Sequence, residues 1–102
     1  MRYNKLVRDK IPQIIADKGG KAEIRILSDE EYACFLEKKL DEEVAEFHRD
    51  RNAEELADIL EVVYALAYSI GCSRKELLEV YEKKHESRGG FGERILLISS
   101  EN

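Results

Sequence analysis

Hydrophobic and polar residues follow the 3.6-residue period of an α-helix over most of this chain. Three helix starts share one signature, a Ser or Asn followed three residues later by Glu: Ser28 and Glu31, Asn52 and Glu55, Ser73 and Glu76. In such a capping box the two side chains satisfy free backbone N–H groups at the start of the helix. The pattern predicts helices over residues 29–50, 53–70 and 74–87.

The two ends of the chain give weaker signals. The stretch RDKIPQIIADK predicts a short first helix with Pro12 in its first turn, where a missing N–H costs least. Residues 22–27 (AEIRIL) and 94–99 (RILLIS) are short and apolar, and they could pair as a two-stranded sheet. Periodicity alone cannot separate a short buried strand from a helix end. The expected fold is mainly all-α, an antiparallel helical bundle, with this small sheet as an open addition.

Length and charge exclude several classes of protein. A chain of 102 residues is expected to form a single domain, residues 1–102. So short a chain buries a modest fraction of its surface, which favours oligomers. The net charge of -5, with 38% charged residues, argues against binding to nucleic acid or to an anionic membrane. A local cluster of Lys and Arg could still bind a small anion.

Other features predict a cytoplasmic protein. No run of 18 apolar residues is present, so no membrane-spanning helix is expected. The first residues, MRYNKLVRDK, are charged where a signal peptide is apolar. The two cysteines, Cys34 and Cys72, have no CxxC spacing and are expected to be reduced, as in the cytosol.

Carboxylates occupy positions that the helical pattern reserves for apolar side chains. Glu43 falls in a column with Leu40 and Phe47, and Glu55 begins a column that Ile59 continues. A buried charge costs several kcal/mol unless it is paired or bound to a metal. For Glu55 the alternative is a purely structural role as the third residue of its capping box.

Glu46 and Asp58 lie on the adjoining edges of the same two helices. Two helices joined by a short turn pack antiparallel, which would bring these carboxylates to face Glu43 and Glu55. Four converging carboxylates repel one another, and hard divalent cations relieve that repulsion. The pattern therefore indicates a metal site, whereas Glu42, Glu54 and Glu61 are expected to be solvated or to lie beside it.

The sequence Glu43-x-x-Glu46 followed by Glu55-x-x-Asp58 resembles the E-x-x-E…E-x-x-D motif of the all-α nucleoside triphosphate pyrophosphohydrolases. That superfamily includes MazG, dimeric dUTPases and phosphoribosyl-ATP pyrophosphohydrolase. The amino-terminal YNKLVRDKIPQII and the late RGGF resemble a small MazG-like branch regarded as house-cleaning enzymes. The resemblance covers nearly the whole chain.

The resemblance implies a helical bundle that forms a homodimer or a homotetramer. It implies cleavage of the α–β phosphoanhydride of nucleoside triphosphates, non-canonical ones in this branch, to a monophosphate and pyrophosphate. Mg²⁺, with Mn²⁺ as a substitute, would be bound by four carboxylates: Glu43, Glu46, Glu55 and Asp58.

Further residues are assigned roles in that reaction. Glu42 and Glu46 are both candidates to accept the proton of the attacking water. The candidate phosphate-binding cations are Arg8, Lys39, Lys84 and Arg88. The last two lie in EKKHESR, where Glu82 and His85 replace the Asn and Phe of the family's element, so contacts to base or sugar there are in doubt. Without a ligand, such cations would simply stabilise a helix C-terminus.

Two alternative functions remain open from the sequence. The same chemistry could act on phosphoribosyl-ATP in histidine biosynthesis. The chain could also be a non-catalytic helical oligomer that binds a nucleotide or a protein partner. The spacing between Glu46 and Glu55, shorter than is usual in the family, requires a tight turn between the two helices.

Overall fold

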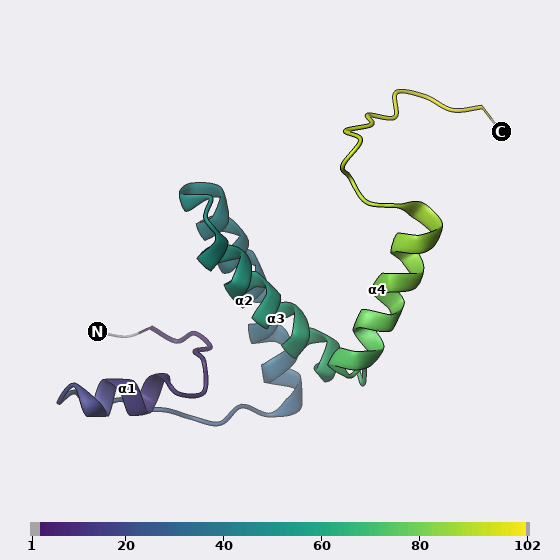
Figure 1. Cartoon of the computed structure of the whole chain (residues 1–102). Coiled ribbons are helices and arrows are strands. Elements are labelled where there is room, and N and C mark those ends of the chain that lie inside the picture. Colours follow the sequence, from purple (N-terminus) through teal and green to yellow (C-terminus); the bar gives the residue numbers. More distant parts are fainter. Residues whose placement is uncertain (1–2, 102) are drawn as a thin grey trace.

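A computed structural model describes residues 3–101 and contains four α-helices and no strand within that range. The helices are α1 (Ile11–Asp17), α2 (Asp29–Asp50), α3 (Ala53–Ser69) and α4 (Arg74–Arg88) (Figure 1). The all-α prediction is confirmed, and the three long helices begin and end within one residue of their predicted bounds.

Side-chain caps fix the starts of the long helices. Ser28 and Ser73 each form a complete capping box with the Glu three residues later. At α3 only half of the box is present, because Asn52 Oδ1 accepts from the Glu55 N–H at 3.0 Å but the Glu55 carboxylate does not return the bond. The Glu55 carboxylate therefore has no part in the cap.

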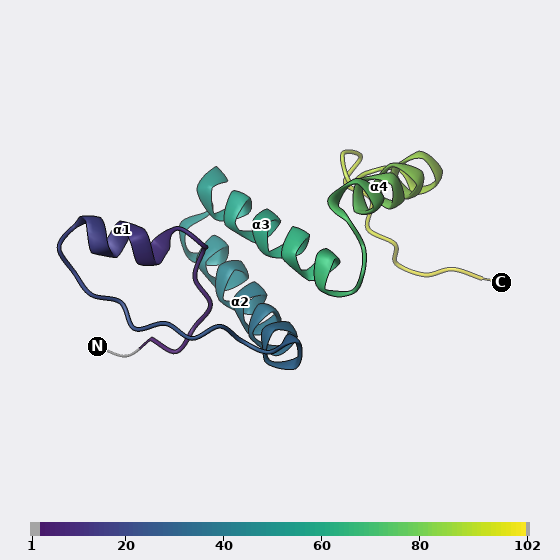
Figure 2. The ribbon, with the colours of Figure 1, turned by 90° about the horizontal axis from the view of Figure 1, so that it is seen from below.

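Helices α2 and α3 pack side by side and antiparallel, as predicted (Figure 2). The turn between them is only two residues long. Arg51 ends α2 with a left-handed backbone (φ 48°) and donates its N–H to Phe47 O at 2.7 Å, and Asn52 then caps α3. Leu36 of α2 and Val62 of α3 are both buried, so the two helices share one core. The short turn places the end of α2 against the start of α3.

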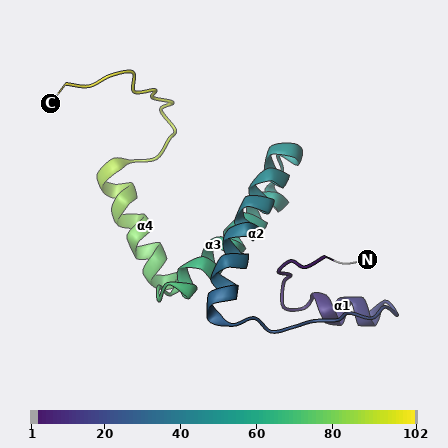
Figure 3. The same ribbon diagram turned by 180° about the vertical axis from the view of Figure 1, so that it is seen from behind.

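Helix α4 leaves the α2–α3 pair. Gly71, with φ 83°, turns the chain after α3, and the Cys72 N–H donates back to Ala67 O at 2.8 Å. The axes of α3 and α4 differ by 107°, and α4 contacts α3 but not α2 (Figures 1 and 3). The protomer is therefore an antiparallel pair with outlying elements, not a closed bundle.

The predicted two-stranded sheet is wrong for the described residues of this chain. Residues 22–27 and 94–99 have no strand structure, and they lie on opposite sides of the molecule in all three ribbon views (Figures 1, 2 and 3). Ile26 and Ile98 are almost fully exposed. A strand needs a neighbour for its backbone N–H and C=O groups, and the outward course of α4 separates these two segments.

The protomer exposes far more surface than a compact chain of its mass. Its accessible surface is 9541 Å², whereas a folded monomer of 11.8 kDa exposes about 5,900 Å². Its radius of gyration is 17.8 Å, against about 13 Å for a compact domain of this length. Among the described residues, the buried apolar side chains are Leu36, Val62 and Ala67. Most apolar side chains thus lack cover within one copy.

No single helix within residues 3–101 is long and apolar enough to cross a membrane; the bent α3–α4 pair meets that criterion only when taken together. Cys34 is exposed and Cys72 half-buried, and both are free thiols.

The α2 capping box generates a prediction about pH. Arg25 Nη1 donates to Glu31 Oε1 at 3.0 Å, and this bond, with that from the Ser28 N–H, lowers the pKa of Glu31 from 4.5 to about 2. The stabilisation is therefore present above pH 4.5 and is lost as the pH falls towards 2. Glu31→Gln keeps the capping geometry but removes the charge. The difference in free energy of unfolding between wild type and Glu31→Gln, measured by urea denaturation, should shrink over that range.

Arg25→Gln serves as the matched variant, because it removes the cation and leaves both capping residues in place. It should remove part of the same pH dependence. A wild-type advantage that stays constant from pH 4.5 to 2 would contradict this origin of the stability.

Candidate metal centre

The end of α2 and the start of α3 bring four carboxylates together. Each of them offers an oxygen, and these oxygens all lie within 4.8 Å of one another: Glu43, Glu46, Glu55 and Asp58. In an octahedral Mg²⁺ shell, with bonds of about 2.1 Å, opposite ligands are about 4.2 Å apart. The predicted convergence is confirmed, and its spacing is close to that of a single coordination shell. We call these four residues the acidic cluster.

Two oxygens of the acidic cluster are buried without a partner. Glu43 is only 5% exposed, and the other three residues are half-buried. Glu43 Oε2 and Glu55 Oε2 make no hydrogen bond to any described residue. A buried oxygen without a partner costs about 1–3 kcal/mol, and more when it is charged. Oxygen donors of this kind are the ligands that Mg²⁺ and Mn²⁺ prefer, so the residues fit a divalent cation.

The electrostatics of Glu43 reflect this crowding. Burial raises the pKa of the Glu43 carboxyl above its ordinary value, and the neighbouring Glu46 carboxyl raises it further. Lys39, whose Nζ lies 3.2 Å from Glu43 Oε1, acts in the opposite direction. In the absence of a divalent cation the fold thus disfavours full ionisation of the cluster.

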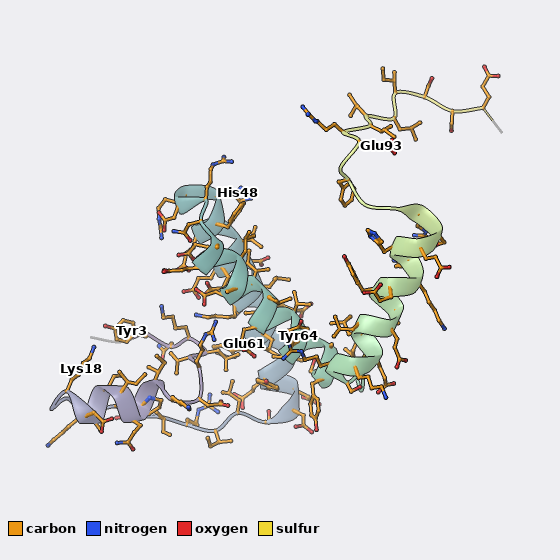
Figure 4. All side chains as sticks on the ribbon, in the orientation of Figure 1. Tyr3, Lys18, His48, Glu61, Tyr64 and Glu93 are labelled. Atoms are coloured by element: carbon orange, nitrogen blue, oxygen red, sulfur yellow. The ribbon has the colours of Figure 1, made fainter. Side chains whose placement is uncertain are left out.

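Two of the predicted phosphate-binding cations contact the acidic cluster directly. Besides the Lys39 contact, Arg8 Nη2 donates to Asp58 Oδ1 at 2.6 Å. Arg8 Nη1 lies 3.7 Å from Glu61 Oε1. Glu61 projects from α3 towards the amino-terminal segment (Figure 4). Glu46 and Glu55 form no ion pair within residues 3–101. Within residues 3–101, cations therefore pair with only two of the four carboxylates of the acidic cluster.

Glu42 lies beside the acidic cluster and is not one of its members. Its two oxygens contact Lys5 Nζ at 3.2 Å and Lys39 Nζ at 3.5 Å. Lys39 thus bridges Glu42 and Glu43, the two adjacent residues that lie one turn after it on α2. A series of ion pairs, from Glu43 through Lys39 and Glu42 to Lys5, thus connects the acidic cluster to the amino-terminal segment.

The structure does not bring Lys84 and Arg88 to the acidic cluster of their own chain. They lie in the carboxyl-terminal half of α4, which points away from α2 and α3 (Figures 1 and 3). The sequence gives no signal of this, because the direction of α4 depends on the backbone turn at Gly71.

Sequence reasoning left two contacts of the site unassigned. Lys5 pairs with Glu42, and Glu61 shares Arg8 with Asp58. A partial signal was present only for Arg8, because Asp58 and Glu61 are three residues apart on one helix face and can share one cation. Pairing them required knowledge of where residues 3–10 run.

Comparisons with known proteins give limited information. No family model matches this chain, and no solved structure is similar to it. One similar protein is an uncharacterised protein of Mycolicibacterium smegmatis (strain ATCC 700084 / mc(2)155), 58% identical over 41 residues. These residues are 40% of this chain and 42% of that protein, so the match spans about two fifths of the relative's length.

We expect Glu46→Gln to stabilise the metal-free protein and to weaken its stabilisation by Mn²⁺. Without metal, the variant should be more stable, because one of four repelling charges is gone; the gain is on the order of 1 kcal/mol for half-buried charges. Wild type should gain about 2.7 kcal/mol from Mn²⁺ at 100 times its dissociation constant. The variant should lose most of that gain. Thermal melts with chelator and with a Mn²⁺ series measure both effects.

Glu37→Gln is the matched control, since Glu37 is an exposed carboxylate of α2 that forms no ion pair with any described residue. It should melt like wild type in both states. If Mn²⁺ stabilises Glu46→Gln as strongly as wild type, the acidic cluster is not the site of binding.

Proposed function

We propose that this protein is a divalent-metal-dependent nucleoside triphosphate pyrophosphohydrolase that cleaves the α–β phosphoanhydride to a monophosphate and pyrophosphate. The observation that carries the proposal is the acidic cluster, with its two buried oxygens that lack a partner. A purely structural cluster would gain from replacing these charges with neutral side chains, since burying them costs free energy. The motif resemblance supports the choice of reaction.

The charges of the site suit a polyphosphate substrate. Mg²⁺ or Mn²⁺, when bound by Glu43, Glu46, Glu55 and Asp58, supplies charge neutralisation for phosphate oxygens and acidifies the attacking water. Arg8 and Lys39 already lie against the acidic cluster, where their ammonium and guanidinium groups can bind phosphate oxygens.

Two carboxylates are candidates for the proton acceptor. Glu42 has both oxygens engaged by lysines, whereas Glu46 lies in the acidic cluster and forms no ion pair in the part of the chain that the structure describes. These contacts favour Glu46 as the acceptor of the proton from the attacking water. Glu42 then holds Lys5 and Lys39 in position. The same reaction on phosphoribosyl-ATP is a question of substrate choice, because a metal ion held by the acidic cluster would contact the phosphates and not the base.

We further propose that the chain is a homo-oligomer, a dimer or a pair of dimers, in the cytoplasm. The surface exposed beyond that of a compact monomer is about 3,600 Å², several times the roughly 800 Å² that each partner buries in a standard interface. Leu56 and Leu60, one turn apart on α3, are about half exposed. Lys84 and Arg88, if they bind phosphate, must do so at the acidic cluster of another copy.

The first experiment is a substrate panel of canonical and damaged nucleoside triphosphates and phosphoribosyl-ATP, each with Mg²⁺, Mn²⁺ or chelator. Wild type should release monophosphate and pyrophosphate only with metal, as read by phosphorus NMR. Asp58→Asn should lower the rate by at least about 100-fold, since it removes a ligand group. Glu37→Gln should leave the rate unchanged. No metal-dependent turnover on any substrate would leave a binding protein as the better description.

The oligomer proposal predicts the effect of charge at the α3 surface. Leu60→Glu should shift the mass found by sedimentation equilibrium from two or four times 11.8 kDa towards one. It should also lower the melting temperature, because the protomer alone buries few apolar side chains. Lys18→Glu, at the exposed end of α1 (Figure 4), should do neither. A wild-type chain that is monomeric at high concentration would contradict the proposal.

A further inference from the structure

A small cavity lies between the amino-terminal segment and α2, beside the acidic cluster but separate from it. Its volume is about 270 Å³, and it is lined by Asn4, Lys5, Leu6, Phe35, Lys38, Lys39 and Glu42. We call it the lysine cavity. Asn4 has a left-handed backbone (φ 46°), which turns the chain there so that Lys5 and Leu6 form one wall.

The charge of the lysine cavity is opposite to that of the protein. Three lysines and one glutamate line it, whereas the whole chain carries a net charge of -5. Glu42 contacts two of the lysines, Lys5 and Lys39. Lys38 has no carboxylate within 4 Å among the described residues, and its Nζ lies 5.2 Å from the centre of the Phe35 ring. One ammonium group therefore remains for an incoming anion.

The size and lining favour phosphate over a nucleobase. The cavity is smaller than the roughly 300–1,000 Å³ that encloses a drug-sized ligand, so it holds only part of a nucleotide. The Lys38 ammonium covers the Phe35 ring, the aromatic surface on which a base would stack. Three flexible ammonium groups are donors suited to the several oxygens of a diphosphate.

Lys39 connects the two sites. Its Nζ is 3.2 Å from Glu43 of the acidic cluster, and the same side chain lines the lysine cavity. A triphosphate whose metal-bound phosphate lies at the acidic cluster could therefore extend its terminal phosphates past Lys39 into the lysine cavity.

We propose that the lysine cavity binds the terminal phosphates of the substrate, the part released as pyrophosphate, through Lys5, Lys38 and Lys39. This inference rests on the proposed function for the identity of the substrate. The chemistry itself, recognition of a diphosphate group by ammonium groups, does not require the acidic cluster to be loaded with metal. Substrate phosphates and free pyrophosphate share that chemistry, and the experiment separates them.

The test is calorimetric titration of inorganic pyrophosphate into the full chain with chelator present. Wild type should bind, and the affinity should fall with added salt because the contacts are exposed charges. Lys38→Gln and Lys5→Gln should each weaken binding about tenfold, the loss of one charge-assisted hydrogen bond. Lys18→Gln, far from the cavity, should bind like wild type. Absence of binding by wild type, or equal affinity of Lys38→Gln and wild type, would overturn the proposal.

Two further arms separate this inference from the proposed function. Asp58→Asn should keep its pyrophosphate affinity in chelator while it loses turnover, so a protein without hydrolysis can still have the lysine cavity confirmed. Pyrophosphate should compete with a non-hydrolysable nucleoside triphosphate analogue in Mn²⁺, and Lys38→Gln should weaken this competition. Simultaneous binding of both molecules would show that the cavity serves free pyrophosphate and not the substrate, which would overturn the assignment.

Discussion

Burial of the Glu43 carboxylate between α2 and α3 is the constraint on which the rest of the site depends. The side chain is among the most buried in the described chain, and its environment raises its pKa. It shares its surroundings with three further carboxylates, and among residues 3–101 the cations paired with the acidic cluster are Lys39 and Arg8. A fold that keeps such a group in its core holds it at a cost in stability, and under the proposed function a divalent cation would supply the missing charge.

The two-residue turn at Arg51 and Asn52 makes this arrangement possible. It brings the last turns of α2 against the first turns of α3, so residues about twelve positions apart share one small volume. Asn52 caps α3 with its own side chain, but the Glu55 carboxylate does not bond back to the Asn52 N–H and lies in the acidic cluster instead. Local capping chemistry and the acidic cluster are thus arranged so that they do not compete for the same carboxylate.

The amino-terminal segment extends the site beyond the two helices. Arg8 contacts Asp58, and Lys5 contacts Glu42, so residues 3–10 lie over one edge of the α2–α3 pair. The result is an acidic region next to a basic one, joined by Lys39. Under the proposed function, a long and strongly anionic substrate would meet a metal at the acidic region and ammonium groups at the basic one.

The sequence by itself determined the helices and the convergence of the four carboxylates. Capping residues such as Ser28 and Ser73, and the 3.6-residue period, are local properties, and a short turn leaves two helices little choice but to pack antiparallel. Glu43 and Glu55 were therefore placed correctly from their apolar columns.

Only the tertiary structure decided which charges meet across long distances and where the outlying segments run. The direction of α4 follows from one backbone turn at Gly71. Because α4 points away from α2 and α3, Lys84 lies away from the acidic cluster of its own chain, and residues 22–27 and 94–99 are too far apart to pair. The contacts of Lys5 and Arg8 join residues 37 and 50 positions apart. No local period encodes such contacts, because they depend on the path of a segment without regular structure.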